Sequence, residues 1–222
     1  MISQFEGQLM STEKVHRKAG RPSRPMSRDE LLNAATDAFA ANGYKGTPLG
    51  LIAESLGVRK ASLFHHVKNK EALYLESLGR ILVGLGELVS EANLGQGTFV
   101  ERLDRLGELV VEFLASHPHA ARLLYREMMD EGPFFTQGGR EQVLTTLEMT
   151  AAFFESGMKE GVVPKQDPKH LAMSIVGMIF TWYTAANLST PLSGTDAFSP
   201  EGVATRKDVV KAHMRRLCGA EV

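Results

Sequence analysis

The chain has 222 residues, of which 43% are hydrophobic and 23% charged, with a formal net charge of −1. This composition excludes a disordered chain, no apolar run reaches the roughly 18 residues that a membrane span needs, and the single cysteine, Cys218, excludes an intramolecular disulfide. We therefore expect a soluble cytoplasmic protein of one or two domains, without membrane contact.

Residues 1–26 are expected to form a mobile basic arm. They contain the run KVHRKAGRPSRP (14–25), whose two prolines oppose helix formation. Residues 1–75 hold 11 Lys and Arg against 7 Asp and Glu, whereas the remaining residues hold 14 against 19. This asymmetry favours a polyanion as the partner of the N-terminal end. The arm either lies in a DNA minor groove, which attracts arginine, or is a solvated tail.

Two helices are expected after the arm. Ser27 and Glu30 have the spacing of a capping box, and apolar residues follow at helical spacing up to Gly43, which is typical of a helix end. Thr47 and Pro48 open the second helix, because threonine supplies a capping oxygen and proline suits the first helical position.

A third short helix is expected over residues 59–66. Helices of about eight residues are unstable alone in water, so this helix and the one before it must pack on each other and on the first. Ala53 permits a close crossing, Gly57 permits the sharp turn between the two, and Leu63 fills the junction. This pattern predicts a helix-turn-helix, whose second helix enters the DNA major groove.

The rest of the chain predicts only helices. Asn69 caps a long helix that runs to about residue 92. Further helices are expected over 98–116, 119–131, 140–160, 169–188 and 203–217, with loops at 132–139 and 191–202. No stretch of useful length has the alternating pattern of a strand. The predicted fold class is therefore all-α, with about nine helices.

The segment around the helix-turn-helix matches a family pattern densely. The matching residues are Phe39, Gly43, Tyr44, Thr47, Ile52, Ala53, Leu56, Gly57, Val58, Ser62, Leu63, Phe64, His66, Lys70 and Leu73. With this spacing, residues 27–75 resemble the DNA-binding domain of the TetR family of bacterial transcriptional regulators. The resemblance implies that residues 76–222 form a larger helical domain for ligand binding and dimerisation.

Placement on this motif predicts six DNA-contacting residues. Three of them face the major groove, where Arg59 or Lys60 suits guanine. The other three lie beside backbone phosphates, and one of these, Lys70, is near a helix N-terminus that itself attracts phosphate. The groove residues are Arg59, Lys60 and Ser62, and the phosphate residues are Thr47, His65 and Lys70. The pair His65 and His66 is not expected to bind a metal, because no cysteine or paired carboxylate lies nearby in sequence. We expect no cofactor and no catalytic residue.

The resemblance also implies a ligand pocket and a dimer interface in the second domain. The pocket candidates are aromatic, methionine and histidine side chains, although ordinary core is the better explanation for any single one of them. They are Phe113, His117, Tyr125, Met128, Phe153, Met173, Phe180 and Trp182. Ten methionines in the chain suit an adaptable apolar lining, so we expect an apolar or amphipathic effector. The helices 169–188 and 203–217 are expected to form the homodimer interface.

The predicted function is a ligand-responsive transcriptional regulator that binds double-stranded operator DNA, most simply a repressor. An activator of the same fold stays open, because the sequence does not separate the two. Two interpretations from different protein classes also stay open. One is an all-α enzyme, for which the chain shows no catalytic signature, and the second is an interaction module whose helix-turn-helix no longer binds DNA.

Overall fold

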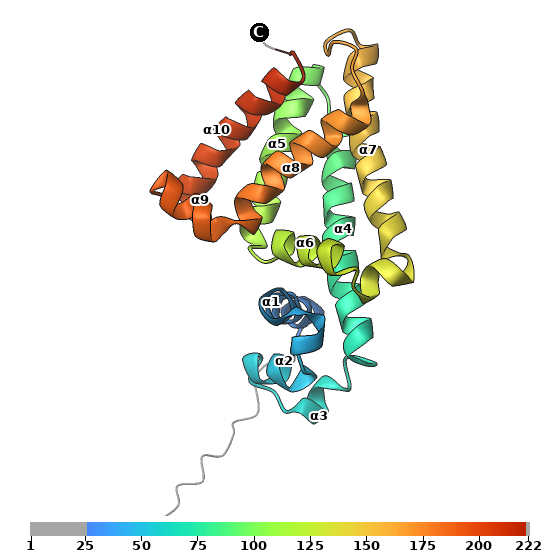
Figure 1. Ribbon diagram of the computed structural model, residues 1–222, viewed down its shortest axis with the longest axis vertical. Helices are drawn as coiled ribbons and strands as arrows, with labels where there is room; N and C mark the ends of the chain where they lie inside the picture. Colours follow the sequence, from blue (N-terminus) through green and yellow to red (C-terminus); the bar gives the residue numbers. More distant parts are fainter. Residues whose placement is uncertain (1–25, 221–222) are drawn as a thin grey trace, which may run out of the picture.

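Ten α-helices and one short π-helix make up residues 26–220, the part of the chain that the computed structural model describes, and no strand occurs within it (Figure 1). The helices are α1 (Arg28–Gly46), α2 (Leu49–Ser55), α3 (Lys60–Leu63), α4 (Lys70–Leu94), α5 (Phe99–Ser116), α6 (Ala120–Asp130), η1 (Phe135–Gly139), α7 (Arg140–Lys159), α8 (Pro168–Thr184), α9 (Ala186–Ser193) and α10 (Pro200–Leu217). The all-α prediction is confirmed. The predicted basic arm lies outside the described residues except for Met26.

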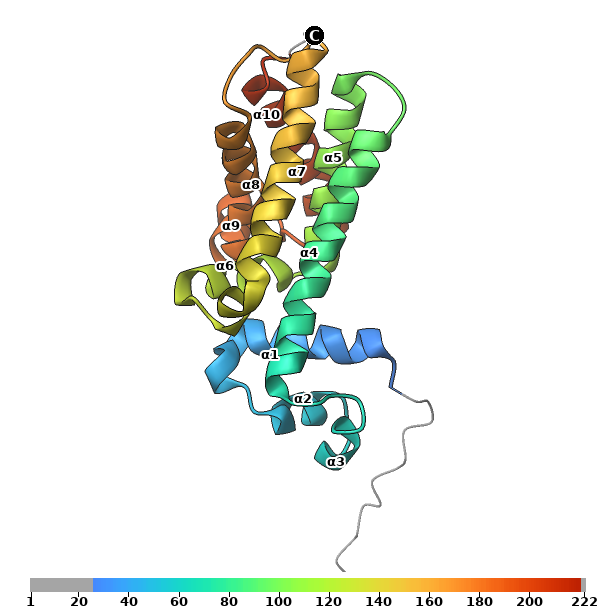
Figure 2. The same cartoon turned by 90° about the vertical axis from the view of Figure 1, so that its right-hand side faces the viewer.

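The helices α1 to α3 form one end of the molecule, and α4 runs from that end into the larger body (Figure 2). Two predicted caps are confirmed at this end. Ser27 accepts from the backbone of Glu30, whose carboxylate accepts from Ser27 N in return, and the Asn69 side chain accepts from the Ala72 amide at 2.7 Å. These caps fix where α1 and α4 begin. The predicted end at Gly43 is a kink with φ of 74°, beyond which α1 continues to Gly46.

The predicted capping role of Thr47 is wrong. Pro48 occupies the N-cap of α2, and no side chain caps that helix. The Thr47 hydroxyl instead donates to the carbonyls of Gly43 at 2.8 Å and Ala38 at 3.1 Å, and the residue is fully buried. Thr47 therefore satisfies two carbonyls at the kinked end of α1, and its side chain is closed off from solvent.

The third helix is shorter than predicted. The helix α3 covers Lys60–Leu63, Arg59 is its N-cap residue, and residues 64–66 continue as a turn. Leu63 is fully buried, in agreement with its predicted role at the junction of the helices.

The turn before α3 depends on the backbone of Gly57, whose φ is 65°, and an added Cβ would meet no atom within 4 Å. We expect Gly57→Ala to lower the free energy of unfolding by about 1 kcal/mol, because a left-handed backbone disfavours a side chain. Gly50 lies in α2 with equal space around it, so Gly50→Ala should raise stability by about 0.5–1 kcal/mol. Urea unfolding of both variants checks this, and shifts of the same sign would contradict it.

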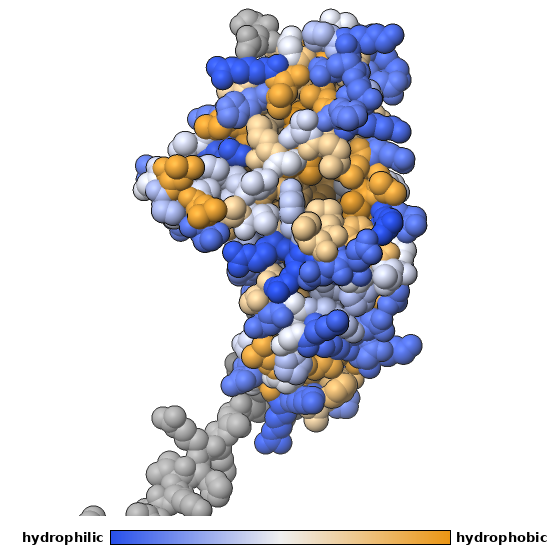
Figure 3. Space-filling model, in the orientation of Figure 1, coloured by the Kyte–Doolittle hydropathy of each residue, from blue (hydrophilic) through white to orange (hydrophobic). Residues whose placement is uncertain are grey.

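The larger body contains α4 to α10. Three ion pairs tie α5 to α10 along their length: Asp104 with Arg215, Glu108 with Lys211, and Glu112 with Lys207. The predicted single helix 169–188 is wrong, because the chain turns at Ala185 and α9 leaves α8 at 83°. Leu188 and Leu192 of α9 are 65% and 84% exposed, and apolar surface gathers over α9 in Figure 3.

Within residues 26–220 no single helix is long and apolar enough to cross a membrane. Only the bent pair α8–α9 has the length and apolar composition for it when the two helices are taken together.

The predicted loop 132–139 contains the π-helical turn η1, and Phe134 is buried there. This buried side chain ties the segment to the body.

Candidate nucleic-acid interface and apolar cavity

The surface of α3 carries side chains without partners inside the protein. Arg59, Lys60, Ser62 and His65 are all exposed, and among the described residues none of these side chains makes a hydrogen bond or ion pair. Leu63, between them, is buried against the other helices. Hydrogen-bonding groups of positive or neutral charge thus remain available for a ligand outside the molecule.

The other two residues predicted to contact DNA, Lys70 and Thr47, are bonded inside the protein instead. Lys70 Nζ donates to the Tyr44 carbonyl at 2.9 Å and lies 4.4 Å from the centre of the Tyr44 ring. This contact fastens the start of α4 to the end of α1. Thr47, buried beneath the same corner, presents no hydroxyl to the surface.

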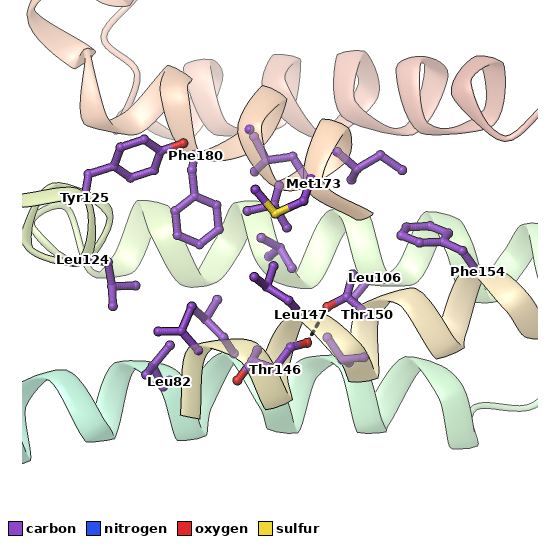
Figure 4. Close-up of a pocket in the computed structure, with 18 of the residues that line it drawn as sticks. Leu82, Leu106, Leu124, Tyr125, Thr146, Leu147, Thr150, Phe154, Met173 and Phe180 are labelled. Carbon is purple, nitrogen blue, oxygen red and sulfur yellow. Dashed lines mark hydrogen bonds between the residues drawn. The ribbon is translucent and has the colours of Figure 1, made fainter. Parts of the chain in front are cut away.

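An apolar cavity of about 150 Å³ lies between α4, α5, α6, α7 and α8 (Figure 4). Its wall contains Leu, Val, Ile, Phe and Met side chains and no Asp, Glu, Lys, Arg or His. Two threonines also reach the wall, but the Thr146 hydroxyl donates to Gln142 O at 3.0 Å and the Thr150 hydroxyl to Thr146 O at 2.9 Å. Tyr125 brings the other side-chain hydroxyl of the lining, so few hydrogen-bonding groups face a bound molecule.

Four of the predicted pocket residues line this cavity: Tyr125, Met128, Met173 and Phe180. The others lie outside its wall. Phe113 stacks on His117 with ring centres 4.5 Å apart. Trp182 lies beneath the Arg206 guanidinium at 4.7 Å, and Phe153 packs on Phe99 with ring centres 5.2 Å apart. Residue type predicts that such side chains are buried, but only the packing shows which of them reach the cavity.

The helix α6 joins the cavity to the helix-turn-helix end through a buried carboxylate that the sequence did not indicate. Glu127 is 2% exposed and accepts from the Tyr74 hydroxyl of α4 at 2.6 Å and from the Phe135 amide at 2.9 Å. Burial, and then the hydrogen bond to Glu127, raise the pKa of Tyr74 well above its ordinary value. The phenol therefore stays protonated and acts as the donor.

A second contact joins α6 to α1. The Arg126 guanidinium donates to the carbonyls of Ala40 at 3.2 Å and Ala41 at 3.4 Å, near the end of α1. A Cβ on Gly43 would come within 3.2 Å of that guanidinium. Cations are favourable at the carbonyl end of a helix, so Arg126 holds α6 against the kinked end of α1.

Two family models match the chain. "Bacterial regulatory proteins, tetR family" matches residues 31–77, and "Tetracyclin repressor-like, C-terminal domain" matches residues 100–212. The chain belongs to the TetR family. The first match covers the helix-turn-helix, and the second covers α6, most of α10 and most of the residues that line the cavity. The resemblance seen in the sequence is thereby confirmed, and it extends beyond the DNA-binding segment.

Individual TetR-family proteins are similar over about half of the chain or more. The transcriptional regulator RutR of Escherichia coli K12 is 29% identical over 167 residues, which cover 74% of this chain and 78% of RutR. The transcriptional repressor KstR2 of Mycolicibacterium smegmatis is 36% identical over 116 residues, which cover 48% of this chain and 52% of KstR2. The crystal structure of PfmR from Thermus thermophilus superposes with a TM-score of 0.66 at 21% identity, covering 86% of this chain and 98% of PfmR. This last similarity confirms the TetR fold.

Membership of the TetR family makes this protein one of a group of DNA-binding transcriptional regulators, which are not enzymes. The interpretation as an enzyme loses its support accordingly.

Proposed function

We propose that this TetR-family protein is an operator-binding repressor that a small, uncharged apolar molecule releases from DNA. The observation that carries the proposal is the double role of α6. Leu124, Tyr125 and Met128 line the cavity, while Arg126 and Glu127 on the same helix hold α1 and α4. A relative named as a transcriptional repressor favours repression over activation.

The DNA-binding end is proposed to act through α3. Arg59, Lys60 and Ser62 enter the major groove, where arginine or lysine pairs with guanine, and His65 contacts a phosphate. Support comes from their exposure and their lack of internal partners. Thr47 is left out because its hydroxyl is buried and bonded. Lys70 is proposed to position the corner of α1 and α4 through Tyr44 rather than to contact phosphate.

The effector is proposed to be uncharged where it lies inside the cavity. A charge buried without a partner is very costly, and the cavity wall offers no ion-pair partner. An apolar cavity of roughly this volume holds a molecule of about the size of benzene. A larger or amphipathic effector would keep its polar end near Met128 and Met173, which are 40% and 57% exposed.

The effector is proposed to act on DNA through α6. Expansion of the cavity displaces Tyr125 and Met128, and the same helix then carries Arg126 and Glu127 away from their present partners. Because α1 packs on α2 and α2 packs on α3, and α4 begins shortly after α3, a shift of α6 changes the direction in which α3 points. Two α3 helices related by a two-fold axis must match the spacing of half-sites, so a small rotation lowers operator affinity.

The dimer is proposed to form through α8 and α10, which lie away from α3 (Figure 1). Ser174 and Thr181 of α8 and Ala212 and His213 of α10 are exposed in the single chain. These side chains are mostly small and carry no fixed charge, which suits close helix packing between two copies.

Selection of bound fragments from random duplexes, with and without neutral apolar compounds, tests the proposal. We expect one preferred two-fold sequence, two copies per site by sedimentation, and a steep fall in affinity as salt rises. Neutral apolar compounds should weaken binding and their carboxylate analogues should not. Leu147→Trp, which fills the cavity, should bind the operator but not respond. A protein that selects no duplex, or a filled variant that responds normally, would refute the proposal.

A further inference from the structure

The surface of α3 includes one large apolar side chain. Phe64 follows directly after α3, keeps helical backbone angles (φ −65°, ψ −14°) and is 50% exposed. The neighbouring apolar residues Leu63 and Val67 are buried instead. Burial of a phenylalanine side chain is normally worth about 1.5–3 kcal/mol. Half of that ring therefore stays in water at a position where the packing of the domain does not require an apolar residue.

The position of Phe64 places it beside the cations of α3. Residues four apart share one face of a helix, so Phe64 lies on the side of Lys60. Arg59, Lys60 and Lys68 are all exposed and, among the described residues, without a side-chain partner. An exposed apolar ring on the face of Lys60, in a segment with two further unpaired cations, suits a polyanion that also offers apolar groups, and it disfavours a purely apolar protein partner.

Duplex DNA has this combination of groups. The major groove shows the 5-methyl group of thymine, an apolar contact that phenylalanine makes, beside the guanine edge that arginine or lysine reads. The second copy of the chain is a poor candidate, because α3 lies at the opposite end of the molecule from α10 (Figure 1).

We propose that Phe64 is a specificity-determining residue that packs on the 5-methyl group of one thymine in each half-site. This inference rests on the proposed operator binding by α3. In this arrangement the Phe64 ring recognises the methyl group of thymine, whereas Arg59 and Lys60 recognise the hydrogen-bonding edges of bases. The preferred half-site then contains a thymine within a base pair or two of a guanine.

The test replaces single thymines with 2′-deoxyuridine in the operator selected by the full-length protein. This change removes only the methyl group and leaves base pairing intact. Replacement of one particular thymine in a single half-site should weaken binding by about fourfold, since burial of one methyl group is worth about that factor. Phe64→Ala should bind the thymine operator more weakly and should no longer distinguish thymine from uracil at that position.

Two further variants keep the test decisive. Phe64→Leu retains an apolar side chain and should retain part of the discrimination. Leu94→Ala removes another exposed apolar side chain, 83% exposed at the far end of α4, and should behave as the wild type. The inference fails if no thymine replacement weakens the wild type, or if Phe64→Ala weakens every duplex alike while keeping the thymine preference. Normal operator binding in either case would leave the proposed function standing.

Discussion

Replacing Glu127 with alanine should lower the free energy of unfolding by about 3 kcal/mol, because buried donors left without an acceptor cost about 1–3 kcal/mol each. The Tyr74 hydroxyl and the Phe135 amide both lose their acceptor in this variant. Urea unfolding followed by circular dichroism measures the change. Glu148→Ala, at an exposed position on α7, is the control and should stay within about 0.5 kcal/mol of the wild type.

The same replacement should also weaken the link between effector and operator. If Glu127 joins α6 to α4, the fold-change in operator affinity caused by a bound effector should shrink in the variant, while effector affinity changes less. Tyr74→Phe removes one donor and leaves the carboxylate bonded to Phe135. It should show a smaller effect in the same direction, and its combination with Glu127→Ala should be non-additive. A destabilisation below about 1 kcal/mol, or an unchanged response to effector, would contradict this role.

The helix-turn-helix was predictable because its signals are local. The caps at Ser27 and Asn69 form between residues three apart, and the turn at Gly57 needs a backbone conformation that glycine adopts readily. Thr47 shows the limit of such reasoning. Its sequence position suits a cap, but its hydroxyl reaches back to Ala38, nine residues earlier, across a kink that the sequence pattern does not specify.

The contacts between the two ends of the molecule were not predictable in this way. Glu127 lies 53 residues from Tyr74 in sequence, and a glutamate on an amphipathic helix is usually solvated. The break at Ala185 has no proline or glycine to mark it. The apolar character of the cavity was predictable, because aromatic and methionine side chains are common in apolar linings. Its members were predicted only in part, since Phe113 and Trp182 face other neighbours.

Arg59→Ala should relax the base preference of the protein. A bidentate contact to guanine is worth about 1–3 kcal/mol of discrimination, so the preferred operator should lose roughly 5- to 150-fold in affinity for each contact removed. Binding to unrelated duplexes should fall much less. The fold should be unaffected, because Arg59 is the N-cap residue of α3 without a capping hydrogen bond from its side chain. Competition binding against the operator and its single-base variants measures the preference.

Lys68→Ala is the matched control for this prediction. Lys68 is an exposed cation that follows the same helix and has no side-chain partner among the described residues. A lysine that meets only phosphate contributes to all duplexes equally, so this variant should weaken operator and unrelated DNA by the same factor and reduce the salt dependence by about one unit of slope. If the two variants behave alike on every duplex, Arg59 does not read a base, and positive charge alone accounts for the binding of α3.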